Sequence, residues 1–154
     1  MEKTDMIYGT RAVIEAILAA KNIGKVMIQS GLSTDLIKEL IAVARNNNVP
    51  VAFVPPEKLK RLSTKNHQGV ICLLSSISFA SLDNLVFKAY NEGREPFFLI
   101  LDRITDVRNF GAIVRTAECA GVDGIILAEK GNAPITSDAM KTSAGALNHV
   151  PICR

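Results

Sequence analysis

The chain has 154 residues, of which 48% are hydrophobic and 21% are charged, and its formal net charge is +3. This composition is typical of a folded globular protein and excludes an intrinsically disordered chain. No apolar run approaches the roughly 18–20 residues of a membrane-spanning helix, and the first residues do not form a signal peptide. Three cysteines in apolar contexts, Cys72, Cys119 and Cys153, predict reduced, buried thiols in a cytoplasmic protein rather than a disulfide or metal framework.

Basic residues are concentrated in the first half of the chain. Residues 1–78 contain ten lysines and arginines against six acidic residues, whereas residues 79–154 contain eight against nine. A basic segment of this kind is compatible with nucleic-acid binding, and it also fits an ordinary solvated surface.

The first half alternates between apolar patterns that are typical of helices and of strands. Its continuous apolar run at residues 69–74 indicates a strand that is covered on both faces. Helices are predicted over residues 10–21, 35–46 and 56–62, and strands over residues 25–29, 51–54 and 69–74.

A serine-rich stretch without helical period predicts a linker at about residues 75–81, between domains at residues 1–78 and 79–154. The alternation continues beyond it, which indicates the α/β class with mostly parallel sheets. In such sheets ligands bind at the carboxyl ends of the strands. The second half is predicted to contain helices over 82–91, 111–120 and 137–144, strands over 97–101, 124–127 and 149–153, and a polar loop over 102–109.

Several common site signatures are absent from the sequence. It contains no G-x-G-x-x-G, no P-loop, no H-E-x-x-H and no C-x-x-C, so dinucleotide binding, P-loop hydrolysis and zinc chemistry lose support. The two histidines, His67 and His149, lie far apart without a paired nucleophile, and no metal site is predicted.

The segment LDRITDVRNFGAIVRTAECAG, residues 101–121, concentrates polar groups between a strand and a helix. Asn109 is predicted to cap the helix, and Gly111 leaves room for the close approach of a ligand. Because helical side chains lean toward the N-terminus, Arg115 is expected to reach back toward Asn109. The alternative is that Asn109 is only a cap and that Arg115 pairs with Glu118 on a solvated face.

Together with SDAMKTSAGALNHVP at residues 137–151, this segment resembles the first conserved region of the SpoU (TrmH-type) RNA ribose 2′-O-methyltransferases of the SPOUT class. The first half of the chain resembles the additional N-terminal substrate-binding domain of the 23S rRNA guanosine enzymes in that family. The residues that carry this resemblance are Tyr8-Gly9, Ala12-Val13, Glu15-Ala16 and the tetrad HQGV at residues 67–70.

The resemblance implies a small α/β/α RNA-binding domain similar to kink-turn-binding ribosomal proteins, followed by the first half of an α/β-knot (SPOUT) domain. It implies methyl transfer from S-adenosylmethionine to a ribose 2′-hydroxyl of structured RNA, with a guanosine of 23S rRNA as the expected target, by a homodimer. The family's active-site asparagine and arginine correspond to Asn109 and Arg115. A guanidinium is effectively always protonated, so Arg115 is expected to position the hydroxyl and its phosphate rather than to act as a base.

Residues expected to contact RNA are Arg11, Lys65, His67, Gln68, Arg103 and Arg108; the alternatives are a structural turn at Lys65–Gln68 and solvated charges elsewhere. The chain departs from the family pattern at Val107, where proline is usual, and at Phe110, where leucine is commoner. The second and third conserved regions are absent, so cofactor-binding residues are expected beyond Arg154 and this chain alone is expected to be inactive. Alternative functions are a tRNA or antibiotic-resistance rRNA methyltransferase, a non-catalytic RNA-binding module and, with less support, a small-molecule-binding α/β domain.

Overall fold

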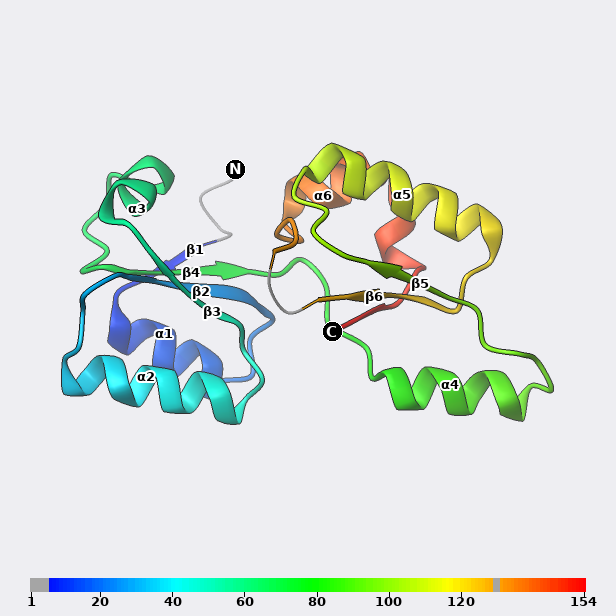
Figure 1. The fold of residues 1–154 in the computed structure, drawn as a ribbon, viewed down its shortest axis with the longest axis horizontal. Coiled ribbons are helices and arrows are strands. Elements are labelled where there is room, and N and C mark those ends of the chain that lie inside the picture. Colours follow the sequence, from blue (N-terminus) through cyan, green and yellow to red (C-terminus); the bar gives the residue numbers. More distant parts are fainter. Residues whose placement is uncertain (1–5, 129–130) are drawn as a thin grey trace. The chain divides into compact units, whose positions relative to one another are not determined.

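The computed structural model describes residues 6–128 and 131–154. These residues form two compact units, residues 6–75 and Ser76–Arg154, each with its own sheet and core (Figure 1). Helices and strands are mixed in both units, which confirms the predicted α/β class. None of the described helices is long and apolar enough to cross a membrane.

The first unit contains a four-stranded sheet in the order β1-β4-β2-β3. Only β2 and β3 run parallel, whereas β4 lies between β1 and β2 and is antiparallel to both. The prediction of a mostly parallel sheet is therefore wrong for this unit, because strand direction depends on how the chain returns and not on local pattern. The strands are β1 (Met6–Tyr8), β2 (Ile23–Gln29), β3 (Val51–Val54) and β4 (Val70–Leu74).

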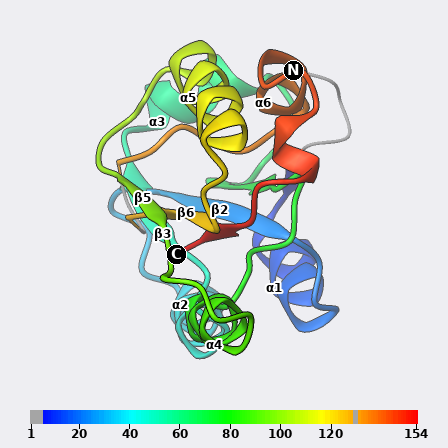
Figure 2. The same ribbon diagram turned by 90° about the vertical axis from the view of Figure 1, so that its right-hand side faces the viewer.

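Helices cover both faces of this sheet. Helices α1 (Thr10–Leu18) and α2 (Asp35–Asn46) pack on one face, and α3 (Pro56–Leu62) lies on the other (Figure 1, Figure 2). The side chains of β4 therefore alternate between two cores, which explains its uninterrupted apolar sequence. One core contains Val13, Ile17, Val26, Leu40, Val70 and Cys72, and the other contains Met27, Leu59, Ile71 and Leu73.

The second unit contains a parallel sheet in the order β5-β6-β7, as predicted for this half. Helices α5 and α6 lie on one side of it and α4 on the other (Figure 1). The core contains Leu101, Phe110, Val114, Ile125 and Ile152. The elements are α4 (Leu82–Asn91), β5 (Phe98–Leu101), α5 (Val107–Ala120), β6 (Gly124–Leu127), α6 (Ser137–Thr142), a 3-10 turn (Ala146–Asn148) and β7 (Ile152–Cys153).

The segment that follows Ser75 is bound to the second unit by backbone hydrogen bonds. The amide of Ser76 donates to the carbonyl of Ile135 at 2.8 Å, and the amide of Ala80 donates to that of Ile152 at 2.8 Å. Its apolar side chains, Ile77 and Phe79, pack against the core of this unit. The segment Ser76–Ala80, which we call the strap, is therefore bound along the second unit.

The cysteines differ in exposure. Cys72 and Cys153 are buried, and burial raises the pKa of both thiols, that of Cys72 to about 12. Cys119 is exposed, so the prediction of a buried thiol is wrong there. It lies on the face of α5 opposite Phe110, Val114 and Ala117, which enter the core.

Candidate functional site

The loop after β5 leads into α5, whose first turn is capped by Asp106. The Asp106 carboxylate accepts hydrogen bonds from the backbone amides of Arg108 at 2.8 Å and Asn109 at 2.9 Å. These are two of the amides that a helix leaves without an intrahelical partner. The helix therefore begins at Val107, and the prediction that Asn109 caps it is wrong. Asn109 is the third residue of the helix, and its side chain does not cap it.

Gly111 faces α6 and not a ligand, so the predicted role of this glycine is also wrong. A Cβ at this position would lie 2.6 Å from the carbonyl carbon of Thr142 and 2.7 Å from its Cβ. The Thr142 hydroxyl lies 3.2 Å from the carbonyl oxygen of Val107 and 3.1 Å from that of Ala139, to which it can donate. The absence of a side chain at Gly111 thus lets α6 approach the first turns of α5, and this contact orients the helix.

Three polar side chains surround Ala112 on the outer face of α5. Residues three or four positions apart are neighbours on a helix surface. Relative to Ala112, Arg108 lies four positions before, Asn109 three before and Arg115 three after. All three are exposed, and in the described part of the structure their side chains make no hydrogen bond or ion pair. The alternative pairing of Arg115 with Glu118 is therefore not formed. Two guanidinium groups and one amide are left available to a ligand.

Arg103 lies in the loop at the carboxyl end of β5. Its guanidinium is 3.9 Å from the carboxylate of Asp102, and the two side chains are 83% and 73% exposed. An ion pair this long and this exposed contributes little to stability. Arg103 is therefore free to pair with an incoming anion.

A second group of predicted residues lies in the first unit, where β1 ends beside the start of β4. Lys65 Nζ lies 5.2 Å from the ring centre of Tyr8, in the geometry of a cation–π contact. The Gln68 side chain is next to Gly9, where a Cβ would lie 3.4 Å from Gln68 Oε1. The structure thus brings Lys65 and Gln68 to the Tyr8-Gly9 pair.

The other two residues predicted in this unit differ in their surroundings. His67 Nδ1 accepts a hydrogen bond from the amide of Gly69 at 3.0 Å, which leaves Nε2–H as the donor of the neutral ring. Arg11 is exposed in the first turn of α1, and its side chain contacts no described residue through a hydrogen bond or ion pair. His67 therefore contributes to the turn and keeps one free donor.

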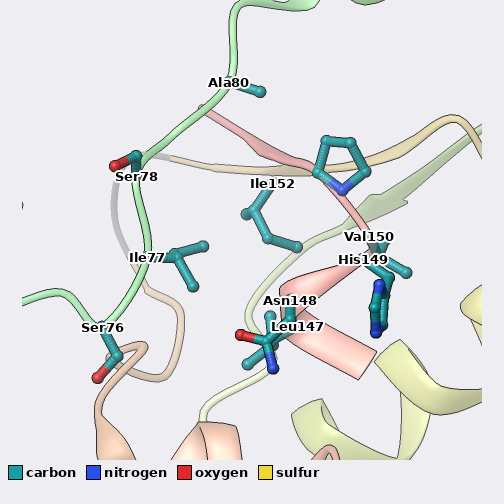
Figure 3. A pocket seen from close by; sticks show the side chains of 10 residues that line it. Ser76, Ile77, Ser78, Ala80, Leu147, Asn148, His149, Val150 and Ile152 are labelled. Carbon is teal, nitrogen blue, oxygen red and sulfur yellow. The ribbon is translucent and has the colours of Figure 1, made fainter. Parts of the chain in front are cut away.

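The second unit also contains a cavity of about 330 Å³ (Figure 3). It lies between the strap at Ser76–Ala80 and the segment Leu147–Ile152, and no residue of α5 lines it. Among the described residues, no cluster of three potential metal ligands occurs and no buried polar side-chain atom lacks a partner. Asn109 and Arg115 therefore do not contribute to the wall of this cavity.

Three residues that shape this site were not predicted from the sequence. Asp106 carried a recognisable signal, because aspartate is a preferred N-cap residue and apolar residues recur from Val107 onward at helical spacing. Thr142 carried none, since its contact with Gly111 joins segments far apart in the chain. Asn132, which accepts a hydrogen bond from the amide of Ile104 beside Arg103, carried no signal either, because this contact also joins segments far apart in the chain.

Comparison with known protein families identifies both units. Residues 6–80 match the family described as RNA 2′-O ribose methyltransferase substrate binding, and residues 96–154 match the SpoU rRNA methylase family. Two relatives assigned by name to the TrmH family of tRNA/rRNA methyltransferases come from Bacillus subtilis and Staphylococcus aureus. They are 31% identical over 153 residues and 36% identical over 154 residues, which is 99% and 100% of this chain. The chain spans 61% and 62% of the length of these relatives.

Solved structures give matches of lower similarity. An AdoMet-bound rRNA methyltransferase from Sinorhizobium meliloti is 24% identical, with a TM-score of 0.42 over 97% of this chain and 53% of the other. The SpoU methyltransferase AviRb from Streptomyces viridochromogenes is 22% identical, with a TM-score of 0.41 over 97% of this chain and 53% of the other. The two family matches, in this order along one chain, show that the chain belongs to the SpoU (TrmH-type) family of RNA methyltransferases.

Proposed function

We propose that the protein to which this chain corresponds transfers a methyl group from S-adenosylmethionine to a ribose 2′-hydroxyl of structured RNA, and that its target is a guanosine of 23S rRNA. The observation that carries this proposal is the pair of family matches, substrate-binding region followed by methylase region. In the second region, the residues that correspond to the family motif, Asn109 and Arg115, stand exposed on one face of α5.

The chemistry of this face suits a ribose hydroxyl beside a phosphate. The hydroxyl is a poor nucleophile until its proton is removed or its developing negative charge is stabilised. The guanidinium group of arginine carries a positive charge, so the side chain of Arg115 can hold the adjacent phosphate and stabilise charge on the oxygen. The Asn109 amide can donate to the hydroxyl oxygen or accept its proton in a hydrogen bond. We therefore assign Asn109 and Arg115 to the reaction, and Arg103 and Arg108 to the RNA backbone.

The first unit is proposed to bind the RNA substrate. Lys65 and Gln68 lie beside Tyr8-Gly9, and Arg11 and His67 offer further donors. Positive and amide groups of this kind position a nucleic-acid backbone, while the shape of the RNA supplies much of the specificity. A domain of this kind can bring a folded RNA to the methylase region.

The methyl donor is proposed to be S-adenosylmethionine. When bound, S-adenosylmethionine would supply the methyl group, and the cavity between Ser76–Ala80 and Leu147–Ile152 has no α5 residue in its wall. We propose that the cofactor-binding residues lie in the part of the relatives' length that this chain does not span. The complete protein is proposed to act as a homodimer in the cytoplasm.

The names of the relatives favour a second candidate substrate, because they include tRNA as well as rRNA. The test is to incubate the complete protein with radiolabelled S-adenosylmethionine and, separately, with unmodified 23S rRNA and tRNA transcripts. We expect label in 23S rRNA that digestion to nucleosides identifies as 2′-O-methylguanosine. Label confined to tRNA would replace the proposed substrate, and label on a base or in neither RNA would refute the proposed reaction.

A further inference from the structure

One asparagine side chain joins the two loops that leave the carboxyl ends of β5 and β6. Asn132 Oδ1 accepts the amide of Ile104 at 3.1 Å, and Asn132 Nδ2 donates to the carbonyl of Ala128 at 2.8 Å. The carbonyl of Ile104 accepts in turn from the amide of Ala133 at 2.7 Å. Asn132 and Ala133 therefore hold Ile104 through both its N–H and its C=O.

The residue just before Ile104 has an unusual backbone. Arg103 adopts a left-handed conformation with φ of 55°, which is uncommon for a residue with a side chain. Such conformations persist where the surrounding structure fixes them, and they occur often at functional sites. Gly131 also lies close to the stem of this side chain, since a Cβ at Gly131 would lie 3.5 Å from Arg103 Cγ.

We propose that Asn132 is a positioning residue that keeps Arg103 left-handed and so presents its guanidinium to a phosphate of the RNA substrate. Arg103 is suited to this role because its side chain is 83% exposed and its described ion pair, with Asp102, is long and solvated. An arginine that is held in place loses less freedom on binding a phosphate than one on a mobile loop. This inference rests on the proposed function, because the ligand is the RNA of that reaction.

A purely structural role for Asn132 predicts different behaviour. If Asn132 only completes a turn, replacing it changes RNA binding by the same factor in the presence and in the absence of Arg103. If Asn132 acts through Arg103, its removal has no effect on RNA binding once Arg103 is gone. A double-mutant cycle separates these cases.

The first measurement needs no RNA. In this chain, Asn132→Ala is expected to speed hydrogen exchange at the Ile104 amide by about tenfold or more, since that amide loses its acceptor and opens locally. Asn132→Asp keeps the acceptor oxygen and is expected to restore protection at Ile104. Unchanged protection of Ile104 in Asn132→Ala would overturn the inference, whatever the protein does with RNA.

The second measurement is the affinity of this chain for a 23S rRNA transcript as a function of salt. The slope of log K against log [salt] is negative, and Arg103→Ala is expected to reduce its magnitude by about one, which corresponds to one lost phosphate contact. Asn132→Ala is expected to weaken binding by roughly threefold or more and to have no further effect in the Arg103→Ala background. Lys88→Ala, which removes an exposed charge on α4, and Asn91→Ala serve as controls and should leave the slope unchanged.

These outcomes distinguish a failure of the RNA role that the proposed function gives to Arg103 from a failure of the role inferred for Asn132. A chain that does not bind the transcript, or an Arg103→Ala slope equal to that of the wild type, would refute the RNA role of this loop and with it the inference. If Arg103→Ala reduces the magnitude of the slope but Asn132→Ala weakens RNA binding equally with and without Arg103, the RNA role stands and Asn132 does not act through Arg103.

Discussion

Replacing Gly111 by alanine tests the contact that holds α5, the helix of Asn109 and Arg115, against α6. The added methyl group would lie 2.6 Å from the carbonyl carbon of Thr142 and 2.7 Å from its Cβ. The optimal separation of carbon atoms is about 3.5–4.0 Å, so the methyl group enters roughly 1 Å too close. Because one contacting atom is backbone, the clash cannot be relieved by a side-chain rotation, and the helices must shift.

Two opposing terms set the size of the effect. Alanine is favoured over glycine within a helix by about 1 kcal/mol, which acts to stabilise the variant. Overpacking a well-filled interior costs about 1–3 kcal/mol, and a clash with backbone belongs at the upper end of that range. We therefore expect Gly111→Ala to lower the free energy of unfolding of the second unit by about 1–2 kcal/mol.

Hydrogen exchange of the α5 amides in increasing urea measures this free energy for the second unit alone. Ala112→Gly is the matched control, because it changes an exposed neighbour and should cost about 1 kcal/mol through helix propensity only. If Gly111→Ala instead stabilises the unit by about 1 kcal/mol, propensity is the only term and the close approach of α5 and α6 is refuted.

Four further measurements test other parts of the structure. Asp106→Ala should lower the free energy of unfolding of the second unit by about 1 kcal/mol in urea titrations, whereas Asp106→Asn, which keeps the capping oxygen, should cost less than half of that. A thiol reagent at pH 8 should modify Cys119 rapidly and Cys72, whose pKa burial raises to about 12, only after unfolding; rapid loss of both thiols would contradict the burial of Cys72. Hydrogen bonding to Arg94 lowers the pKa of Asp123 in the folded protein. The ionised carboxylate therefore stabilises the fold at pH values above the pKa of the unfolded state, and this contribution is lost as the pH falls through the pKa of the folded state. Asp123→Asn should therefore flatten the loss of stability below about pH 4 in acid titrations, and an unchanged acid limb would contradict the interaction. Calorimetric titration of this chain with S-adenosylmethionine should show no micromolar binding, and such binding would mean that the described residues suffice for the cofactor.

Local sequence pattern was sufficient to locate most helices and strands. The helices Asp35–Asn46 and Leu82–Asn91 and the strand Gly124–Leu127 have the predicted bounds, because each combines a clear apolar period with capping or turn residues. The strand Met6–Tyr8 was not predicted, since three residues are too few to show a period and its place depends on pairing with β4.

The errors arose where a contact joins distant segments or where two caps compete. The antiparallel course of β4 follows from how the chain returns through α3, which no local pattern records. Gly111 was interpreted as space for a ligand because Thr142, which occupies that space, lies in another helix. Both Asp106 and Asn109 are good N-cap residues, and the structure shows that the first of them caps α5.

The site residues were predicted from the resemblance more than from their spacing. On spacing alone, Arg115 had an equally plausible partner in Glu118, and only the structure shows that this pair is not formed. The geometry adds that Arg108, Asn109 and Arg115 surround Ala112 on one exposed face. Their roles in methyl transfer are a proposal that needs a functional measurement.

That measurement compares Arg115→Ala with the matched control Glu118→Ala in the complete protein, using labelled S-adenosylmethionine and 23S rRNA. We predict that Arg115→Ala abolishes methyl transfer and leaves RNA affinity nearly unchanged, whereas Glu118→Ala keeps both. Methyl transfer by Arg115→Ala at the rate of the wild type would contradict the assignment of α5 as the catalytic face.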